Sequence, residues 1–291
     1  MALTIRRINC WILVDIELQM MEETMIQFQD KQLTIFRSQL FKTTSTVIET
    51  EDCILLVDPN WLPQEIETIQ AHIAKIQSGR PLYLLFTHSD WDHIIGYGAF
   101  PDAIVIASEA FQKRADKEQI VEQIRTFDDN YYIDRAYSLS YPTVDIVIQH
   151  EKQTVTIGET TITFYLANGH TNDGLFAIVE PLGIWIAGDY LSDVEFPYIY
   201  DCSFAYEETL AKVDVILQQH NIHYLIPGHG NMTMEIEEIK KRQRDAATYI
   251  KALRKCIEQE KDSEYLIAGY AYPRNMREFH KGNIRLMQAE N

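Results

Sequence analysis

The feature that most constrains this chain is a loop in which four potential metal ligands fall within six consecutive positions. The loop contains His88, Asp90, Asp92 and His93, and it directly follows the apolar run 82–86. A short apolar run of this kind predicts a buried strand. An α/β protein usually places its chemistry in loops at the ends of such strands. The loop therefore predicts an α/β fold with a metal site at a sheet edge.

Three further motifs each place a histidine or an aspartate after an apolar run. Together with the first loop they supply four histidines and three aspartates, which is enough to hold two metal ions. The motifs are Gly169-His170-Thr171, Gly188-Asp189-Tyr190 and Pro227-Gly228-His229-Gly230.

The charge of the chain argues against some classes of partner. The formal net charge is −17, so nucleic acids and anionic membrane surfaces would on average be repelled. A small-molecule substrate is the expected partner. The apolar content of 46% and the charged content of 24% are ordinary for a soluble enzyme.

The cysteines and the hydropathy favour a cytoplasmic protein. The four cysteines lie far apart and form no Cys-x-x-Cys pair, which fits a reducing compartment and argues against a thiolate zinc site. There is no apolar stretch of about 18 residues that would predict a transmembrane helix. The apolar run 10–14 is cut short by Asp15 and is not followed by a cleavage site of small residues, so we predict no signal peptide.

The periodicity predicts an extension over residues 1–24 and one domain over 25–291, including a helical C-terminal segment. The order of the predicted elements favours two β-sheets packed face to face with helices outside. Strands are predicted at 33–36, 44–49, 53–58, 82–86, 103–107, 144–148, 154–157, 161–167, 175–179, 184–187 and 223–226; helices at 63–77, 108–125, 206–220 and 235–260; and a long surface loop at 126–142.

From about residue 30 to 232 the chain resembles the metallo-β-lactamase superfamily. The signature of that family is a His-x-His-x-Asp-His loop, followed by a His, an Asp and a final His at successive strand ends. Asp58, in Val57-Asp58-Pro59, matches the family's first motif. The resemblance implies a four-layered αβ/βα sandwich with the metals in a cleft at one edge of the two sheets.

The resemblance also implies a ligand set and a reaction. One ion would be held by His88, Asp90 and His170, the other by Asp92, His93 and His229, and Asp189 would bridge them. A hydroxide held between the ions would attack an ester, lactone, thioester or phosphodiester of a small molecule. Asp92 would also orient this nucleophile.

Three more residues have candidate roles around these ligands. Tyr190 is a candidate oxyanion donor, with a packed aromatic ring as the alternative. Asp58 is expected to support the ligand loop through hydrogen bonds, and Asp173 is expected either to cap a turn or to fix the His170 ring.

Asp90 departs from the family pattern, because it stands where the second histidine is usual. Two divalent ions contribute +4 and three carboxylates −3, so the cluster is one unit less positive than with the usual histidine. Zinc remains the expected ion, and iron and manganese become alternatives because a carboxylate favours harder ions. A non-haem di-iron oxidoreductase is therefore the second hypothesis, since flavodiiron proteins also carry an acidic residue at this place. An inactive binding scaffold and a nuclease are less favoured by the nearly complete ligand set and by the charge.

Some features carry no assigned role. His280 lies in a C-terminal segment that could reach over the cleft, and Tyr198 and Tyr200 could line a hydrophobic pocket. The long helix 235–260 could pack on the domain or on a second copy in a homodimer.

Overall fold

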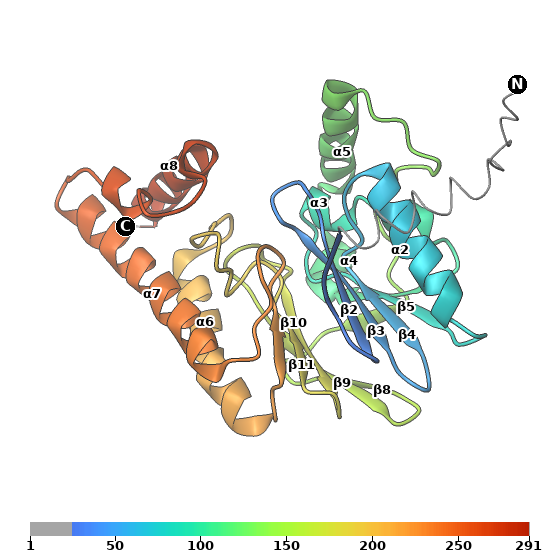
Figure 1. Cartoon of the computed structure of the whole chain (residues 1–291). Coiled ribbons are helices and arrows are strands. Elements are labelled where there is room, and N and C mark those ends of the chain that lie inside the picture. Colours follow the sequence, from blue (N-terminus) through green and yellow to red (C-terminus); the bar gives the residue numbers. More distant parts are fainter. Residues whose placement is uncertain (1–24, 291) are drawn as a thin grey trace, which may run out of the picture.

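Two β-sheets pack face to face at the centre of the structure, with helices on the outer face of each sheet (Figure 1). The computed structural model describes residues 25–290, so the predicted extension over 1–24 lies outside the described residues. The α/β sandwich with two mixed sheets confirms the fold class expected from the sequence.

The first sheet contains seven strands in sequence order. Its first four strands pair antiparallel, and the pairs from β4 to β7 are parallel. The strands are β1 (Ile26–Gln29), β2 (Leu33–Arg37), β3 (Thr44–Glu49), β4 (Ile54–Val57), β5 (Leu82–Leu85), β6 (Ile104–Ser108) and β7 (Ile146–Ile148).

The second sheet contains five strands in the order β12-β11-β10-β9-β8. Only the β11–β12 pair is parallel. The strands are β8 (Thr154–Ile157), β9 (Thr160–Leu166), β10 (Leu175–Glu180), β11 (Ile184–Ile186) and β12 (Tyr224–Ile226).

The helices divide between the two sheets, with α2 to α5 beside the first and α6 to α8 beside the second (Figure 1). The first group is α2 (Pro63–Ile76), α3 (Trp91–Ile94), α4 (Glu109–Lys113) and α5 (Lys117–Tyr131), with the 3-10 turn η1 (Tyr97–Ala99). The second group is α6 (Ser203–Gln219), α7 (Ile236–Glu258) and α8 (Pro273–Ala289), with the 3-10 turn η2 (Glu264–Leu266).

The burial pattern of the central strands explains the layers. In β4, Leu55 and Val57 join the core between the two sheets, whereas Ile54 and Leu56 face the core under the first group of helices. Strand β10 divides its residues in the same way between the inter-sheet core and the core under α6, α7 and α8. Strands buried on both faces read as continuous apolar runs, because neither face meets water.

The topology brings the ends of several strands to one edge of the sandwich. Strands β4, β5 and β6 run in parallel, so their carboxyl ends share an edge of the first sheet. Both β9 and β11 pair antiparallel with β10, and β12 is parallel to β11, so β9, β11 and β12 also end together. The backbone amide of Thr44 donates to Gly228 O at 2.7 Å and joins the two sheets at this edge.

Two predictions about the helices were wrong. The predicted loop 126–142 begins inside α5, which continues to Tyr131 because Phe127 packs against Trp61 and Trp91. Tyr132 then ends the helix in the left-handed conformation, with φ 55°. The predicted helix 108–125 is two helices, α4 and α5, separated at Arg114.

Candidate metal centre

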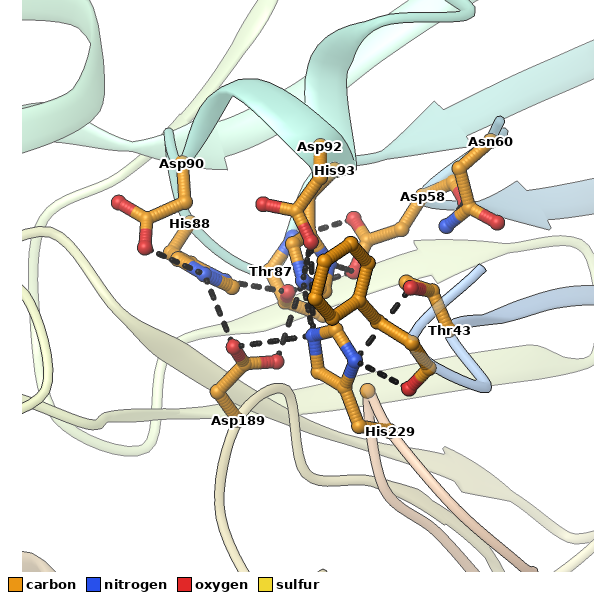
Figure 2. A network of polar contacts seen from close by, with 12 residues as sticks. Thr43, Asp58, Asn60, Thr87, His88, Asp90, Asp92, His93, Asp189 and His229 are labelled. Carbon is orange, nitrogen blue, oxygen red and sulfur yellow. Dashed lines mark hydrogen bonds and ion pairs between the residues drawn. The ribbon is translucent and has the colours of Figure 1, made fainter. Parts of the chain in front are cut away.

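The seven predicted metal ligands meet at the shared edge of the two sheets (Figure 2 labels six of them, all but His170). Ligand atoms within 4.8 Å of one another form three groups. The groups are His88, Asp90 and His170; Asp92, His93 and His229; and His88, His93 and Asp189. Loop segments that lie far apart in the sequence therefore supply one cluster.

The first group surrounds Asp90 Oδ2. This atom lies 3.3 Å from His170 Nε2 and 3.8 Å from His88 Nε2. A metal–ligand bond of about 2.1 Å in tetrahedral geometry separates neighbouring ligand atoms by about 3.4 Å. Asp90 therefore lies where a ligand would lie, in the position that departs from the family pattern.

The second group surrounds Asp92 Oδ2, which lies 3.4 Å from His229 Nε2 and 3.6 Å from His93 Nε2. The two imidazole Nε2 atoms lie 3.4 Å apart. These separations also fit a shared cation.

Asp189 lies between the two groups. Its Oδ2 is 3.3 Å from His170 Nε2 in the first group and 3.3 Å from His229 Nε2 in the second, and its Oδ1 is 3.1 Å from His93 Nε2. Its Oδ2 is thus near a histidine of each group, which is the position from which a carboxylate can contact two ions.

All four histidines direct Nε2 toward the centre of the ligand cluster and form hydrogen bonds to other residues through Nδ1. A carbonyl oxygen can only accept, so the bonds to Tyr198 O and Phe41 O place the proton on Nδ1 of His170 and His229. Thr87 Oγ1 donates to Asp58, so it accepts from His88 Nδ1. The Nδ1 contacts are His88 to Thr87 Oγ1 at 3.0 Å, His93 to Asp58 Oδ2 at 2.9 Å, His170 to Tyr198 O at 2.7 Å and His229 to Phe41 O at 3.0 Å.

This orientation buries nitrogen lone pairs that no hydrogen-bond donor contacts. Within residues 25–290, His88 Nε2, His170 Nε2 and Asp189 Oδ1 are buried without a hydrogen-bond partner. Orphaned buried polar atoms are costly, so a group of them needs an explanation such as an ion. Neutral imidazoles and carboxylates are suitable ligands for zinc, iron or manganese, so the residues present fit a divalent metal pair.

The carboxylates of the cluster favour positive charge on the neighbouring imidazoles. Burial disfavours an imidazolium, but Asp189 and Asp90 outweigh it and raise the pKa of His170 to about 10. Burial likewise disfavours charge on His93 and His229, yet the carboxylates around them raise the pKa of both. In contrast, burial and the nearby His93 hold the pKa of His88 well below its usual value. Divalent ions would take the place of the protons that these rings otherwise hold.

Asp58 supports the ligand loop, as expected from the sequence. Its Oδ1 accepts from Thr87 N at 2.9 Å, and its Oδ2 accepts from Thr87 Oγ1 at 2.6 Å and from His93 Nδ1 (Figure 2). One carboxylate thus fixes the start of the loop and the ring of a ligand.

Gly228 allows the two sheets to close on the cluster. A Cβ atom at this position would lie 2.2 Å from Asp189 Oδ1 and 2.9 Å from His93 Cε1. Any other residue here would displace the Asp189 carboxylate, which explains the glycine before His229.

Tyr190 does not direct its hydroxyl toward the cluster. The hydroxyl donates to Asn168 O at 2.7 Å and accepts from His170 N at 3.0 Å, and burial raises its pKa. These contacts argue against the predicted oxyanion donor. They make Tyr190 a positioning residue for the loop that carries His170.

Asp173 does not hold the His170 ring, whose Nδ1 is bonded to Tyr198 O. Its Oδ2 lies 3.5 Å from Arg114 Nη1, and its backbone carbonyl accepts from Ser108 Oγ at 2.8 Å. The contact with Arg114 ties the loop after His170 to the segment between α4 and α5.

The C-terminal helix α8 supports the site through a residue that the sequence did not single out. Asn283 Nδ2 donates to Pro197 O at 2.6 Å, and its Oδ1 accepts from Ile199 N at 2.9 Å. These bonds hold both sides of Tyr198, whose carbonyl anchors His170. His280 is fully buried behind the cleft between Tyr249 and Ser263, so it has no access to a substrate.

Replacing Asn283 with alanine is expected to weaken metal binding about tenfold. This is the lower end of the roughly 10–100-fold effect of removing a residue that holds a metal ligand in place. Competition with a chromogenic chelator would measure the dissociation constant. Asn275→Ala, at an exposed asparagine of the same helix α8, is the matched control. Unchanged affinity in a folded Asn283→Ala protein would show that the carbonyl of Tyr198 needs no support from α8.

Glu195 is a cleft residue for which the sequence offers no signal. Its Oε1 lies 3.9 Å from His229 Nδ1, and burial raises its pKa to about 7. It follows no strand and belongs to no motif, so only the fold reveals its proximity to the cluster.

Comparison with known proteins agrees with the geometry. Residues 39–250 match the family model described as "Metallo-beta-lactamase superfamily". This match covers more than half of the chain, and the chain belongs to the metallo-β-lactamase superfamily. No curated protein matches the sequence.

Solved structures with low sequence identity share the fold. A sec-alkylsulfatase, Pisa1 from Pseudomonas sp., is 13% identical with a TM-score of 0.62, over 90% of this chain and 49% of that chain. This chain therefore spans about half the length of the sulfatase. A metallo-beta-lactamase family protein from Thermus thermophilus is 15% identical with a TM-score of 0.60, over 88% of this chain and 91% of that one. ETHE1 from Myxococcus xanthus is 15% identical with a TM-score of 0.53, over 75% and 85%.

Proposed function

We propose that this protein is a metal-dependent hydrolase that uses two divalent ions, with zinc as the expected pair, to cleave an ester, lactone, thioester or phosphodiester of a small molecule. The observation that carries the proposal is the position of Asp189 between two complete groups of three ligands, within 3.3 Å of His170 and of His229. Membership in the superfamily supports the same conclusion.

Two divalent ions held by these residues would supply Lewis acidity, which polarises a substrate oxygen and lowers the pKa of a bound water. The residues of the chain prepare this chemistry. The Nδ1 bonds of the four histidines fix their rings and present bare Nε2 atoms. Asp92 lies at the centre with a side chain that is 15% exposed, so it can both ligate and orient the attacking water.

The proposed substrate is a small molecule, and the proposed location is the cytoplasm. The net charge of −17 disfavours nucleic acid. No helix within residues 25–290 has the length and apolar character that crossing a bilayer requires.

A non-haem di-iron oxidoreductase is the second candidate, and Asp90 favours it. Its Oδ2 faces His170 Nε2 at 3.3 Å, so the first site has one histidine fewer than the family pattern and one carboxylate more. Harder ions such as iron are better matched to this donor set.

Elemental analysis of natively purified protein, combined with a chromogenic hydrolysis panel on the zinc, manganese and iron forms, tests both proposals. Hydrolysis by the redox-silent zinc form supports the hydrolase. Iron in the native protein with oxygen-dependent chemistry, and no turnover of the panel by any loaded form, would overturn it in favour of the second candidate.

The variant Asp90→His is expected to raise the zinc-to-iron ratio of the purified protein on the order of tenfold, because it removes a hard anionic ligand and restores a nitrogen donor. Metal content per chain after growth in a medium with both ions would measure it. Asp90→Asn is the control that removes the charge without adding nitrogen ligation. An unchanged ratio in Asp90→His would mean that Asp90 is not a ligand.

A further inference from the structure

Arg114, in the segment between α4 and α5, lies beside two of the loops that carry metal ligands. Its side chain is 24% exposed and lines a hollow of about 410 Å³ next to Asp90. Within residues 25–290 its hydrogen bonds and ion pairs go to Ser89, Asp116 and Asp173. Two of these three partners belong to the loops that supply the first group of ligands.

Asp116 fixes the orientation of the Arg114 guanidinium. Its Oδ1 accepts from Arg114 Nε at 2.7 Å and its Oδ2 from Nη2 at 3.1 Å, the two-pronged pairing that suits a planar guanidinium. This pairing leaves Nη1 to contact the ligand loops. Nη1 donates to Ser89 Oγ at 2.7 Å and lies 3.5 Å from Asp173 Oδ2. One nitrogen atom thus links both loops.

The two linked loops belong to different sheets. Ser89 is fully buried and directly precedes Asp90 in the loop after β5 of the first sheet. Asp173 follows His170 by three positions in the loop between β9 and β10 of the second sheet. The first group takes its ligands from these same two loops. Arg114 therefore holds together the two loops across which the first group closes.

Asp90 is the ligand next to this contact. It precedes helix α3 without a side-chain hydrogen bond to the helix amides, and its carboxylate instead faces the rings of His88 and His170. It is also the ligand that departs from the family pattern. The bond from Arg114 to Ser89 restrains the residue that carries Asp90 into the first group.

The second group has supports of its own. Asp58 Oδ2 accepts from His93 Nδ1 at 2.9 Å, and Phe41 O accepts from His229 Nδ1 at 3.0 Å. Neither bond involves Arg114. Loss of the Arg114 guanidinium should therefore leave the second group in place.

We propose that Arg114 is a positioning residue for the ion of the first group, so that loss of its guanidinium weakens the binding of that ion selectively. The inference rests on the metal pair of the proposed function, but it does not depend on the reaction that the pair performs. Metal binding alone can therefore test it.

Calorimetric titration of the metal-free full chain with Mn²⁺ is the first test. The wild-type protein is expected to bind two ions. In Arg114→Ala one dissociation constant is expected to rise about tenfold or more, the usual effect of removing a residue that holds a metal ligand in place, and the other to stay close to its wild-type value. Arg114→Lys keeps the charge but not the planar fork, so it should lie between the two proteins. Ser89→Ala removes only the accepting hydroxyl and should give a smaller loss of the same ion.

The position of the retained ion identifies the weakened site. A crystal of Arg114→Ala with one equivalent of Mn²⁺ is expected to show anomalous density at the second group, beside Asp92 and His229, and not at Asp90. Electron paramagnetic resonance of the wild-type protein with two equivalents should show the spin coupling of a manganese pair. The variant with the same amount should show the spectrum of uncoupled ions.

Chemical rescue separates positioning from a general loss of stability. The hollow beside Arg114 is partly open, so added guanidinium ion can enter the space that Arg114→Ala leaves and contact Ser89 and Asp173. It is expected to restore binding of the lost ion in this variant. Arg80→Ala is the matched control, because Arg80 is 19% exposed, pairs with Glu49 at 2.6 Å and lies before β5, at the opposite edge of the sheet from the ligands. It should bind both ions as the wild-type protein does.

The outcomes distinguish this inference from the proposed function. Equal weakening of both ions in Arg114→Ala, or an ion retained at Asp90 instead of the second group, would overturn the inference and leave the proposed function intact. If Arg114→Ala does not fold, the same criteria apply to Arg114→Lys and Ser89→Ala. Selective loss of the first ion in a protein that hydrolyses no substrate would support the inference, and only the proposed reaction would then fail. A wild-type protein that binds fewer than two ions would contradict both.

Discussion

The isosteric change Asp189→Asn is expected to lower the metal content from two ions per chain to one or fewer. It is also expected to reduce kcat/KM for any hydrolysed substrate by more than about 100-fold, because loss of a mere hydrogen-bond partner of a metal ligand already costs up to about 100-fold. The reason is the place of Asp189 between the two groups of ligands, where both its oxygens face imidazole Nε2 atoms at 3.1–3.3 Å. An amide keeps one of these oxygens but replaces the other with a donor that cannot ligate, and it removes a negative charge.

Metal per chain by mass spectrometry and steady-state kinetics would measure both effects of Asp189→Asn. Asp201→Asn, at an exposed carboxylate outside the ligand groups, is the matched control and should retain both ions. Two ions per chain with full activity in Asp189→Asn would rule out a bridging role.

Removal of the metal by a chelator is expected to abolish hydrolysis and to lower the melting temperature. A ligand present at 1,000 times its dissociation constant stabilises the folded state by about 4 kcal/mol. At roughly 2–4 °C per kcal/mol for a domain of this size range, the expected decrease is about 10 °C. The physical cause is the set of buried Nε2 and Oδ1 atoms that lack a hydrogen-bond partner within residues 25–290.

Calorimetry before and after chelation, followed by reloading with zinc or manganese, would measure this loss and its recovery. The chelator should shift the melting temperature of Asp189→Asn less, because that variant has less metal to lose. Identical melting curves for loaded and chelated wild-type protein, with metal loss verified, would contradict a structural contribution of the ions.

The fold and the convergence of the ligands could be predicted from the sequence for a clear physical reason. Each ligand motif follows an apolar run, and the strands that these runs form end at one edge of the sandwich. The place of Asp58 beside the ligand loop could also be predicted, because it follows β4, the parallel neighbour of β5.

The partners of the imidazoles could not be predicted. His170 and His229 are held by the backbone carbonyls of Tyr198 and Phe41, a role that any residue type can perform. The motif could suggest Tyr190 as a donor, but only the fold shows that its hydroxyl is bonded to Asn168 O.

The bounds of helix α8 could not be predicted, because two of its buried positions are polar. Met276, His280, Asn283 and Met287 share its buried face, and the histidine and asparagine interrupt the apolar period that predicts a helix. Their hydrogen bonds to Tyr249, Ser263 and the segment 197–199 replace the missing apolar contacts.

The dependence of His170 on α8 has a consequence for biosynthesis. Asn283 follows every ligand in the chain, and its contact with the segment 197–199 forms only after α8 has left the ribosome. A nascent chain can therefore display all seven ligands while one of them still lacks its anchor. Stable loading of both ions therefore requires that α8 has emerged and docked, and a ribosome-bound chain stopped before Asn283 should retain metal less well than the released protein.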